Sequence, residues 1–238
     1  MRGFIYVNYG TSHLEHLKRS IASVKRFCDY PITVWTDKPT GIDGEQFYTP
    51  NKYKGLKDKY VGVHTVTQTR TDKILESPYS ETCYLDGDIY IVDRGFLCGF
   101  DMLEKYPIMM PQNPRWFSTT ENGSGDSECG ANISKHDKKT IKSLPKYMTA
   151  WNAGVQFVKK CAVSRVFYKE ISKLQKEGVG RDQTKIMIAS WSTGFYPYVL
   201  PVHWCVCQEH AEIANPLALH CDHEPVMKRW KRDYENIS

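Results

Sequence analysis

Apolar and polar residues along the first part of the chain follow two different periods. Residues 4–8 form a short apolar run that predicts a buried strand, and residues 31–37 predict a second one. Between them, residues 14–28 place apolar side chains at helical spacing, with Thr11 or Ser12 as the expected N-cap. A strand, a helix and a strand in close succession form a βαβ unit, which requires a parallel sheet. The pattern therefore predicts an α/β fold.

The same alternation continues after a connection at 41–55 that is rich in Gly, Pro and Tyr. A helix is expected over about 59–75, and the strand 82–85 is separated from a second apolar run, 89–92, by two acids. The later part of the chain predicts two strands, at 153–158 and 198–200, and two helices, at 164–176 and 184–191.

Two segments lack a sustained period. Residues 111–148 predict a long functional loop with a short helix, in which Trp116 is either an aromatic platform for a bound ring or an anchor of the loop on the core. The highly charged tail 228–238 is expected to fray. A length of 238 residues is near the upper end of what one hydrophobic core supports, so we expect a single domain.

Composition narrows the class of protein. With 41% apolar, 25% charged and 13% aromatic residues, the chain is typical of a globular protein, which excludes disordered and coiled-coil classes. We find no run of about 18 apolar residues and no signal peptide, so neither a membrane span nor secretion is expected. The eight cysteines are spread along a chain that does not need disulfides, which predicts reduced thiols and a cytoplasmic location. A net charge of +5 permits an anionic partner.

The acids Asp86 and Asp88 are the most informative candidates for chemistry. Carboxylates at i and i+2 in an extended chain point to one face, and the intervening Gly87 allows close approach of another group. At the end of a strand of an α/β sheet, this pair suits Mg²⁺ or Mn²⁺ with coordination positions left for phosphate oxygens. A solvated turn between two strands is the structural alternative.

Three motifs together resemble the nucleotide-sugar-dependent glycosyltransferases of the GT-A fold, particularly those similar to glycosyltransferase family eight. The segment 84–89 resembles the aspartate-any-aspartate motif of that family, and the segment 151–155 resembles its Asn-Ala-Gly strand. Asp182-Gln183 at a helix start is the third motif. The resemblance implies a single GT-A-like (Rossmann-like) domain with a mostly parallel central sheet, in which residues 1–110 bind the nucleotide and residues 111–238 bind the acceptor.

The resemblance also assigns roles to individual residues. Asp86, Asp88 and His220 would hold Mn²⁺ or Mg²⁺, with His223 as the alternative to His220, because the family's glycine and Lys-Pro-Trp tail are absent after the histidine. The residues expected to contact the donor are Val7, Asn8, Tyr9, Thr11, Asp37, Arg70, Lys73, Asp86, Gly87, Asp88, Ala153, Gly154 and Lys228. The catalytic candidates near the anomeric carbon are Asp182, Gln183 and Asn152. Arg70 and Lys73 have an equally good explanation as a solvated helix face.

The expected activity is transfer of a sugar from a nucleoside diphosphate sugar, with UDP and retention of configuration favoured, to a glycan or other acceptor hydroxyl. A nucleotide-sugar-binding or nucleic-acid-binding module is the alternative, including a glycosyltransferase that acts on nucleic acid, because the basic loop 135–146 could contact phosphates. Cys205 and Cys207, with His210 and His220 or Cys221, are ligands of the kind zinc takes, although their spacing differs from that of structural zinc sites.

Overall fold

A mixed sheet of eight strands runs through the computed structural model, which describes residues 1–50, 58–117, 144–145, 148–177 and 182–235. The strands are β1 (Arg2–Asn8), β2 (Ile32–Thr36), β3 (Glu45–Phe47), β4 (Glu81–Leu85), β6 (Ile108–Phe117), β7 (Thr149–Trp151), β8 (Val155–Lys159) and β9 (Tyr198–Leu200). Their order is β3-β2-β1-β4-β8-β6-β7, with β9 also paired to β6. The strands β3, β2, β1 and β4 are mutually parallel, whereas β8 is antiparallel to both of its neighbours.

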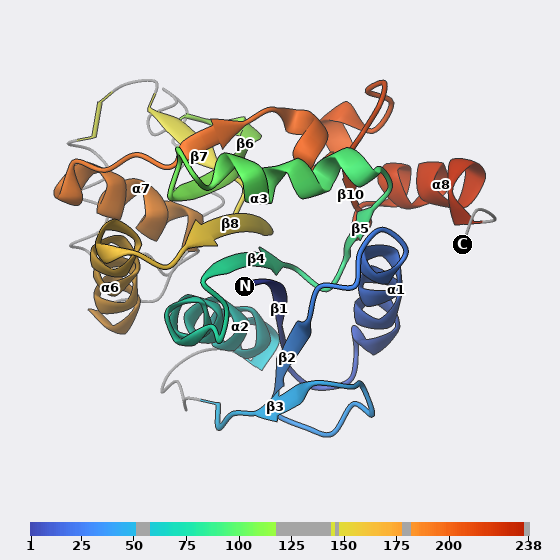
Figure 1. The fold of residues 1–238 in the computed structure, drawn as a ribbon, viewed down its shortest axis with the longest axis horizontal. Coiled ribbons are helices and arrows are strands. Elements are labelled where there is room, and N and C mark those ends of the chain that lie inside the picture. The colour runs from blue at the N-terminus through green and yellow to red at the C-terminus, as the bar shows by residue number, and fades with distance from the viewer. Residues whose placement is uncertain (51–57, 118–143, 146–147, 178–181, 236–238) are drawn as a thin grey trace.

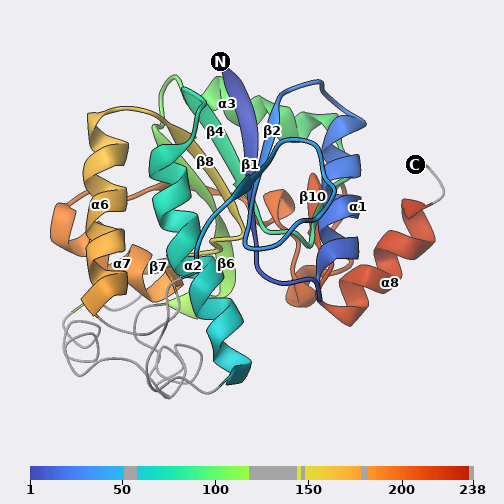
Figure 2. The ribbon, with the colours of Figure 1, turned by 90° about the horizontal axis from the view of Figure 1, so that it is seen from below.

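Helices cover both faces of this sheet. The helices are α1 (Leu14–Lys25), α2 (Asp58–Glu76), α3 (Cys98–Met102), α6 (Ala162–Glu177), α7 (Asp182–Thr193) and α8 (Glu224–Asp233), with short 3-10 turns η1 (Arg94–Leu97), η2 (Val202–Trp204) and η3 (Gln208–His210). Figure 1 shows α2, α6 and α7 on one side of the sheet and α1 on the other, and Figure 2 shows α6, α2 and α1 in succession. The fold is therefore a three-layer α/β/α arrangement.

The alternation of side chains along β1 explains the two layers. Phe4 and Tyr6 join the core beneath α1 and α3, whereas Ile5 and Val7 join the core beneath α2, α6 and α7. Because both faces are buried, the strand is a continuous apolar run rather than an alternating one. This is the pattern from which the strand was predicted.

The order of the strands creates a switch point between β1 and β4. From β1 the chain passes through α1 to β2 and then to β3, each placed further to one side. It then returns through α2 to β4, which pairs with the opposite edge of β1. In open α/β sheets, the crevice at the carboxyl ends of two such strands is the usual place for a ligand.

A second, two-stranded sheet lies beside this crevice. The strands β5 (Ile89–Ile91) and β10 (Ala218–His220) are antiparallel, with His220 opposite Ile89. Helix α8 packs on them, and the rings of Tyr90 and Trp230 meet edge to face at 5.1 Å between centroids. Figure 1 shows this sheet next to α1 and α8. The C-terminal part of the chain is thus brought to the end of β4.

The predicted fold class is confirmed, and several boundaries are corrected. Residues 111–117 belong to β6 rather than to a loop, and the remainder of the predicted loop lies mostly outside the described residues. Residues 224–233 form α8, whose buried Val226 and Arg229 explain why most of the tail does not fray. Helix α1 begins after His13, with no side-chain cap from Thr11 or Ser12.

Two further expectations concern the whole chain. Among the described helices, none has the length and apolar character needed to cross a membrane. The seven cysteines in the described residues are free thiols, whereas Cys129 lies outside those residues. The predicted reduced state is consistent with these free thiols.

Candidate active site

Asp86 and Asp88 lie where β4 leaves the large sheet and enters the small one. The backbone between them is a turn rather than the extended chain expected from the sequence, because the Ile89 N–H donates to the Asp86 carbonyl at 3.1 Å. Gly87 packs against Leu17 of α1, where an added Cβ would lie 3.5 Å from the Leu17 side chain. The turn nevertheless brings the two carboxylates to one place, beside His220.

His220 reaches the two acids because β10 pairs with β5. Its Nε2 lies 3.3 Å from Oδ2 of Asp88, and the next residue, Cys221, donates its N–H to the Asp88 carbonyl at 2.8 Å. One carboxylate oxygen from each acid and one ring nitrogen of His220 lie within 4.8 Å of one another. The structure therefore brings together the three residues predicted as metal ligands. His223 lies farther along the chain, with its ring centroid 5.1 Å from that of His220.

The charges of Asp88 and His220 depend on each other. Burial alone would raise the pKa of Asp88, but the charge and hydrogen bond of His220 outweigh burial and leave the pKa below its usual value. Burial would lower the pKa of His220, and Asp88 outweighs it, so that this pKa is well above its usual value. In the absence of a metal, the two side chains form an ion pair at neutral pH.

The donor atoms fit a hard divalent cation. Oδ1 of Asp88 is buried and has no hydrogen-bond partner within the described residues, and an unsatisfied buried carboxylate oxygen is costly unless a cation or water meets it. The side chains of Asp86, Asp88 and His220 are 28%, 21% and 18% exposed, so they are open to a ligand from one side. Carboxylate oxygens with one imidazole suit Mn²⁺ and accept Mg²⁺.

Arg70 on α2 points into the protein and forms an ion pair with Asp86. It is 4% exposed, and its Nη1 donates to Oδ1 of Asp86 at 2.9 Å and to the Ala153 carbonyl at 3.0 Å. Its guanidinium also lies over the ring of Tyr84, and the Tyr84 hydroxyl donates to the same Asp86 oxygen. Arg70 therefore orients a carboxylate and a backbone loop, and the solvated-face explanation is wrong for this residue.

The segment Asn152-Ala153-Gly154 forms the neighbouring wall of the site. Oδ1 of Asn152 accepts the Gly154 N–H at 2.9 Å, and the Gly154 carbonyl accepts the Asp86 N–H at 2.8 Å. A Cβ on Gly154 would lie 2.9 Å from Oδ2 of Asp86. Glycine is thus required here because the carboxylate approaches the backbone closely.

The ends of β1 and β2 form a second polar edge at the same end of the sheet. Asp37 accepts the Gly10 N–H at 2.7 Å, and Asn8 donates to the Gly10 carbonyl at 2.9 Å. Gly10 has a φ of +68°, which favours glycine at this turn. Tyr9 is half-buried and Thr11 is exposed beside it. The side chain of Val7 is buried in the core.

Three predicted site residues are placed apart from the carboxylates or lack a described side chain. Lys73 lies over the Trp35 ring at 4.1 Å and pairs with Glu76 at 2.6 Å. Lys228 is on the exposed face of α8 and pairs with Glu224 at 2.7 Å. Asp182 begins α7, but its side chain lies outside the described residues. The following residue, Gln183, is half-buried.

Sequence reasoning missed the roles of two side chains that complete the site, Tyr84 and His16. Tyr84 precedes Asp86 by two positions, and this spacing on a strand could have indicated that both residues share a face. His16 of α1 bonds the Tyr90 hydroxyl at 2.8 Å and contributes to lowering the pKa of Asp88. Cys207, which the sequence grouped with Cys205 and His220 as a candidate zinc ligand, lies 3.7 Å from Nδ1 of His220.

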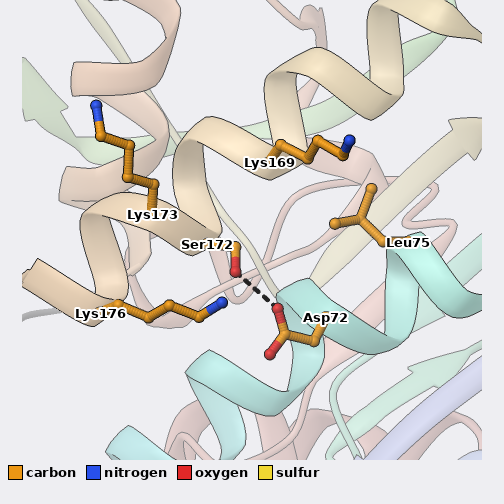
Figure 3. A pocket seen from close by; sticks show the side chains of 6 residues that line it. All are labelled: Asp72, Leu75, Lys169, Ser172, Lys173 and Lys176. Carbon is orange, nitrogen blue, oxygen red and sulfur yellow. Dashed lines mark hydrogen bonds between the residues drawn. The ribbon is translucent and has the colours of Figure 1, made fainter.

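A groove between α2 and α6 is a separate surface feature. Its volume is about 530 Å³, and Figure 3 shows its lining residues: Asp72, Leu75, Lys169, Ser172, Lys173 and Lys176. The Ser172 hydroxyl donates to Asp72 at 2.8 Å across the groove. Asp72 is two residues from Arg70, which points inward to Asp86, so the groove belongs to a different face of α2.

Comparison with known proteins places this geometry in a structural class. No protein-family model and no curated protein sequence matches the chain. Solved structures do match. The bifunctional glycosyltransferase WbbM has a TM-score of 0.58 at 14% identity, over 93% of this chain and 46% of the WbbM chain. This chain therefore spans about half the length of WbbM.

Two further structures match over most of their own length. Mouse xyloside xylosyltransferase 1 has a TM-score of 0.56 at 9% identity, over 92% of this chain and 97% of that one. The galactosyltransferase LgtC, solved with donor and acceptor sugar analogues, has a TM-score of 0.55 at 13% identity, over 92% of this chain and 86% of that one. The chain therefore has the GT-A glycosyltransferase fold.

Proposed function

We propose that the chain is a metal-dependent glycosyltransferase that moves a sugar from a nucleoside diphosphate sugar to an acceptor hydroxyl. The observation that carries this proposal is the meeting of Asp86, Asp88 and His220 at the switch point of a glycosyltransferase fold, where one buried Asp88 oxygen has no partner among the described residues. The similar structures bear the names of sugar transferases, which supports the same reaction class.

Mn²⁺ or Mg²⁺, held by Asp86, Asp88 and His220, would supply Lewis-acid stabilisation of the diphosphate as it leaves. Arg70 keeps Asp86 in position from the protein interior while Gly154 leaves room for its carboxylate. Cleavage of the bond to the anomeric carbon increases the negative charge on the diphosphate, so fixed positive charge at this place lowers the barrier. The carboxylates of Asp86 and Asp88 would contribute by holding the metal ion in place.

The nucleotide is proposed to bind at the edge formed by Asn8, Tyr9, Gly10 and Asp37. The Gly10 turn presents its backbone at the carboxyl end of β1, and the half-buried Tyr9 offers an aromatic face for a base. UDP is the favoured nucleotide and retention the favoured outcome, both on the resemblance to family eight. Asp182, Gln183 and Asn152 remain the proposed catalytic residues beside the sugar.

A donor screen tests this proposal directly. Purified protein is incubated with Mn²⁺ and a panel of nucleoside diphosphate sugars, and release of the nucleoside diphosphate is measured, because glycosyltransferases commonly hydrolyse their donor slowly without an acceptor. The proposal predicts Mn²⁺-dependent release from one or a few donors, with a UDP-sugar among them. Binding of donors without any turnover, with or without a panel of acceptors, would favour a binding module.

The nucleic-acid alternative has less support. The basic loop 135–146, on which it rests, lies mostly outside the described residues. A salt titration of any nucleic-acid affinity would detect a phosphate-contacting surface through a steep dependence on salt concentration.

A further inference from the structure

Two buried cysteines lie beside His220, and one of them, Cys207, contacts the ring nitrogen that is not directed at Asp88. Cys205 and Cys207 belong to the segment that joins η2 to η3. The Val206 N–H donates to the Ala218 carbonyl, and the His220 N–H donates to the Val206 carbonyl, each at 3.0 Å. These bonds fix the segment beside β10 and bring both thiols close to the imidazole.

The spacing of the three side chains suits one shared ion. Sγ of Cys207 lies 3.7 Å from Nδ1 of His220. Sγ of Cys205, Sγ of Cys207 and a ring nitrogen of His220 all lie within 4.8 Å of one another. Two thiolates on a tetrahedral zinc ion, with bonds of about 2.3 Å, are roughly 3.8 Å apart. Only small side-chain movements are needed to enclose an ion.

We propose that Cys205, Cys207 and His220 form a second metal site, for a thiophilic ion such as Zn²⁺, and that this site competes with the carboxylate site for His220. The existence of the thiol site stands on the geometry of the three side chains. The competition rests in addition on the proposed function, since it requires Mn²⁺ or Mg²⁺ on Asp86 and Asp88.

Competition follows from the chemistry of a neutral imidazole, which has a lone pair on one ring nitrogen and a proton on the other. Nε2 lies 3.3 Å from Asp88, and Nδ1 faces Cys207. An ion on the thiol site uses the lone pair of Nδ1, which leaves the proton on Nε2 directed at Asp88. The proton that Nδ1 carries in the ion pair with Asp88 passes to solvent as the ion binds, together with the protons of the two thiols. His220 then donates to Asp88 and no longer serves as a ligand for the carboxylate site.

The two sets of donors select different ions. Thiolates prefer Zn²⁺ and other soft ions, whereas carboxylates prefer Mg²⁺ and Mn²⁺. Nδ2 of Asn152 lies 3.1 Å from Sγ of Cys207, and a hydrogen bond from this amide stabilises a thiolate. Three protein donors leave one position of a tetrahedral ion for water. The thiol site would therefore act as a soft-metal inhibitor site next to the proposed catalytic metal.

Cadmium provides a direct probe of the thiol site. Cd²⁺ is titrated into the purified protein, and the ultraviolet charge-transfer band of a cadmium–thiolate bond is followed. We expect one equivalent to bind, with the band retained in Asp86→Asn and in the control variants Cys98→Ser and Cys129→Ser. Cys205→Ser and Cys207→Ser should each weaken Cd²⁺ binding by about tenfold or more. Absence of the band in the wild type, or an unchanged Cd²⁺ affinity in Cys205→Ser, would contradict the site.

A second arm tests the competition. Mn²⁺ binding is measured by the paramagnetic resonance signal of free Mn²⁺, before and after one equivalent of Cd²⁺. The apparent Kd for Mn²⁺ should rise about tenfold or more in the wild type and stay unchanged in Cys205→Ser. Cys205→Ala replaces that variant if circular dichroism shows that serine unfolds the protein. Unchanged Mn²⁺ binding with Cd²⁺ in place would refute the sharing of His220.

Failure of the two proposals can be distinguished. If the protein binds no Mn²⁺ even without Cd²⁺, the carboxylate site of the proposed function is wrong. The cadmium band of the wild type and the weaker Cd²⁺ binding of Cys205→Ser still test the thiol site in that case. This experiment uses neither Mn²⁺ nor turnover.

Discussion

Nε2 of His220 lies 3.3 Å from Oδ2 of Asp88, which joins the C-terminal part of the chain to the turn that follows β4. The contact depends on the pairing of β10 with β5, in which His220 stands opposite Ile89. A carboxylate from the large sheet and an imidazole from the small one thereby become neighbours. A metal ion bound at this place would have to displace the proton that the two side chains share.

Mn²⁺ affinity should rise with pH through the neutral range. In the metal-free protein Asp88 raises the pKa of His220 well above its ordinary value of about 6.5, so His220 carries a proton that a metal must displace. The shift of Asp88 is downward, so this carboxylate stays ionised and adds no dependence of its own near neutrality. Calorimetry at pH 7, in buffers of different ionisation enthalpy, should show release of about one proton per Mn²⁺.

His220→Asn provides the control for this proton. The variant should bind Mn²⁺ more weakly and release no proton from this position. Wild-type affinity that is constant between pH 6 and pH 8 would show that His220 is not a ligand. The same ion pair should stabilise the metal-free fold, an effect that is lost as pH rises through the folded pKa of His220.

Loss of Arg70 should destabilise the fold as well as the site. Arg70→Met removes the charged donor to Oδ1 of Asp86 and to the Ala153 carbonyl. The carboxylate oxygen keeps the Tyr84 hydroxyl as a donor, and the carbonyl keeps the Gln156 amide. Since Asp86 is partly exposed, we expect a loss of about 2 to 3 kcal/mol in the free energy of unfolding, measured by urea denaturation. Lys18→Met removes an exposed pair with Glu15 and should cost less than about 0.5 kcal/mol. Equal effects of the two substitutions would refute the buried role of Arg70.

Gly154→Ala should weaken metal binding without unfolding the protein. The added Cβ would lie 2.9 Å from Oδ2 of Asp86, so this carboxylate must shift. We expect the Kd for Mn²⁺ to rise about tenfold. Gly87→Ala is the matched comparison, because its Cβ would meet Leu17 at an ordinary 3.5 Å and should have a smaller effect. Wild-type Mn²⁺ affinity in Gly154→Ala would show that the close approach of Gly154 to Asp86 does not matter for metal binding.

Asp37→Ala should separate nucleotide binding from metal binding. Oδ1 of Asp37 accepts a hydrogen bond from the Gly10 N–H at 2.7 Å, and this bond fixes the turn after β1. Its loss should raise the KM for the donor several-fold while the Kd for Mn²⁺ stays unchanged. Asp43→Ala, at an exposed position, is the control and should leave both quantities as in the wild type. If Asp37→Ala left the donor KM unchanged, the nucleotide would have to bind elsewhere.

Local sequence patterns predicted the frame of the site. The apolar runs around Asp86 and Asp88 indicated two strands joined at the acids, and the apolar run before His220 indicated the strand that carries it. The inward orientation of the Arg70 side chain was not predictable, because the sequence does not show which elements pack against its helix. A charged residue on such a helix is equally well explained by exposure to solvent. Residue types alone indicated Cys207 and His220 as candidate zinc ligands, whereas their contact follows from pairing between segments distant in sequence.

Two elements were missed for similar physical reasons. Residues 224–233 are highly charged, and helix α8 is fixed by tertiary contacts of Val226 and Trp230 that composition does not reveal. Residues 111–117 continue β6 through pairing with β7 and β9, although two prolines and polar residues obscure the strand pattern. In both segments, tertiary packing outweighs local preference.

The most direct test of the central claim is the rate of nucleoside diphosphate release from the preferred donor, measured against Mn²⁺ concentration in the wild type and in Asp88→Asn. The substitution keeps the size of the side chain but removes the negative charge and one of the two carboxylate oxygens. The account predicts a Mn²⁺-dependent rate in the wild type and a loss of about 100-fold or more in Asp88→Asn, with a folded protein by circular dichroism. Equal rates in the two proteins at limiting Mn²⁺ would contradict it.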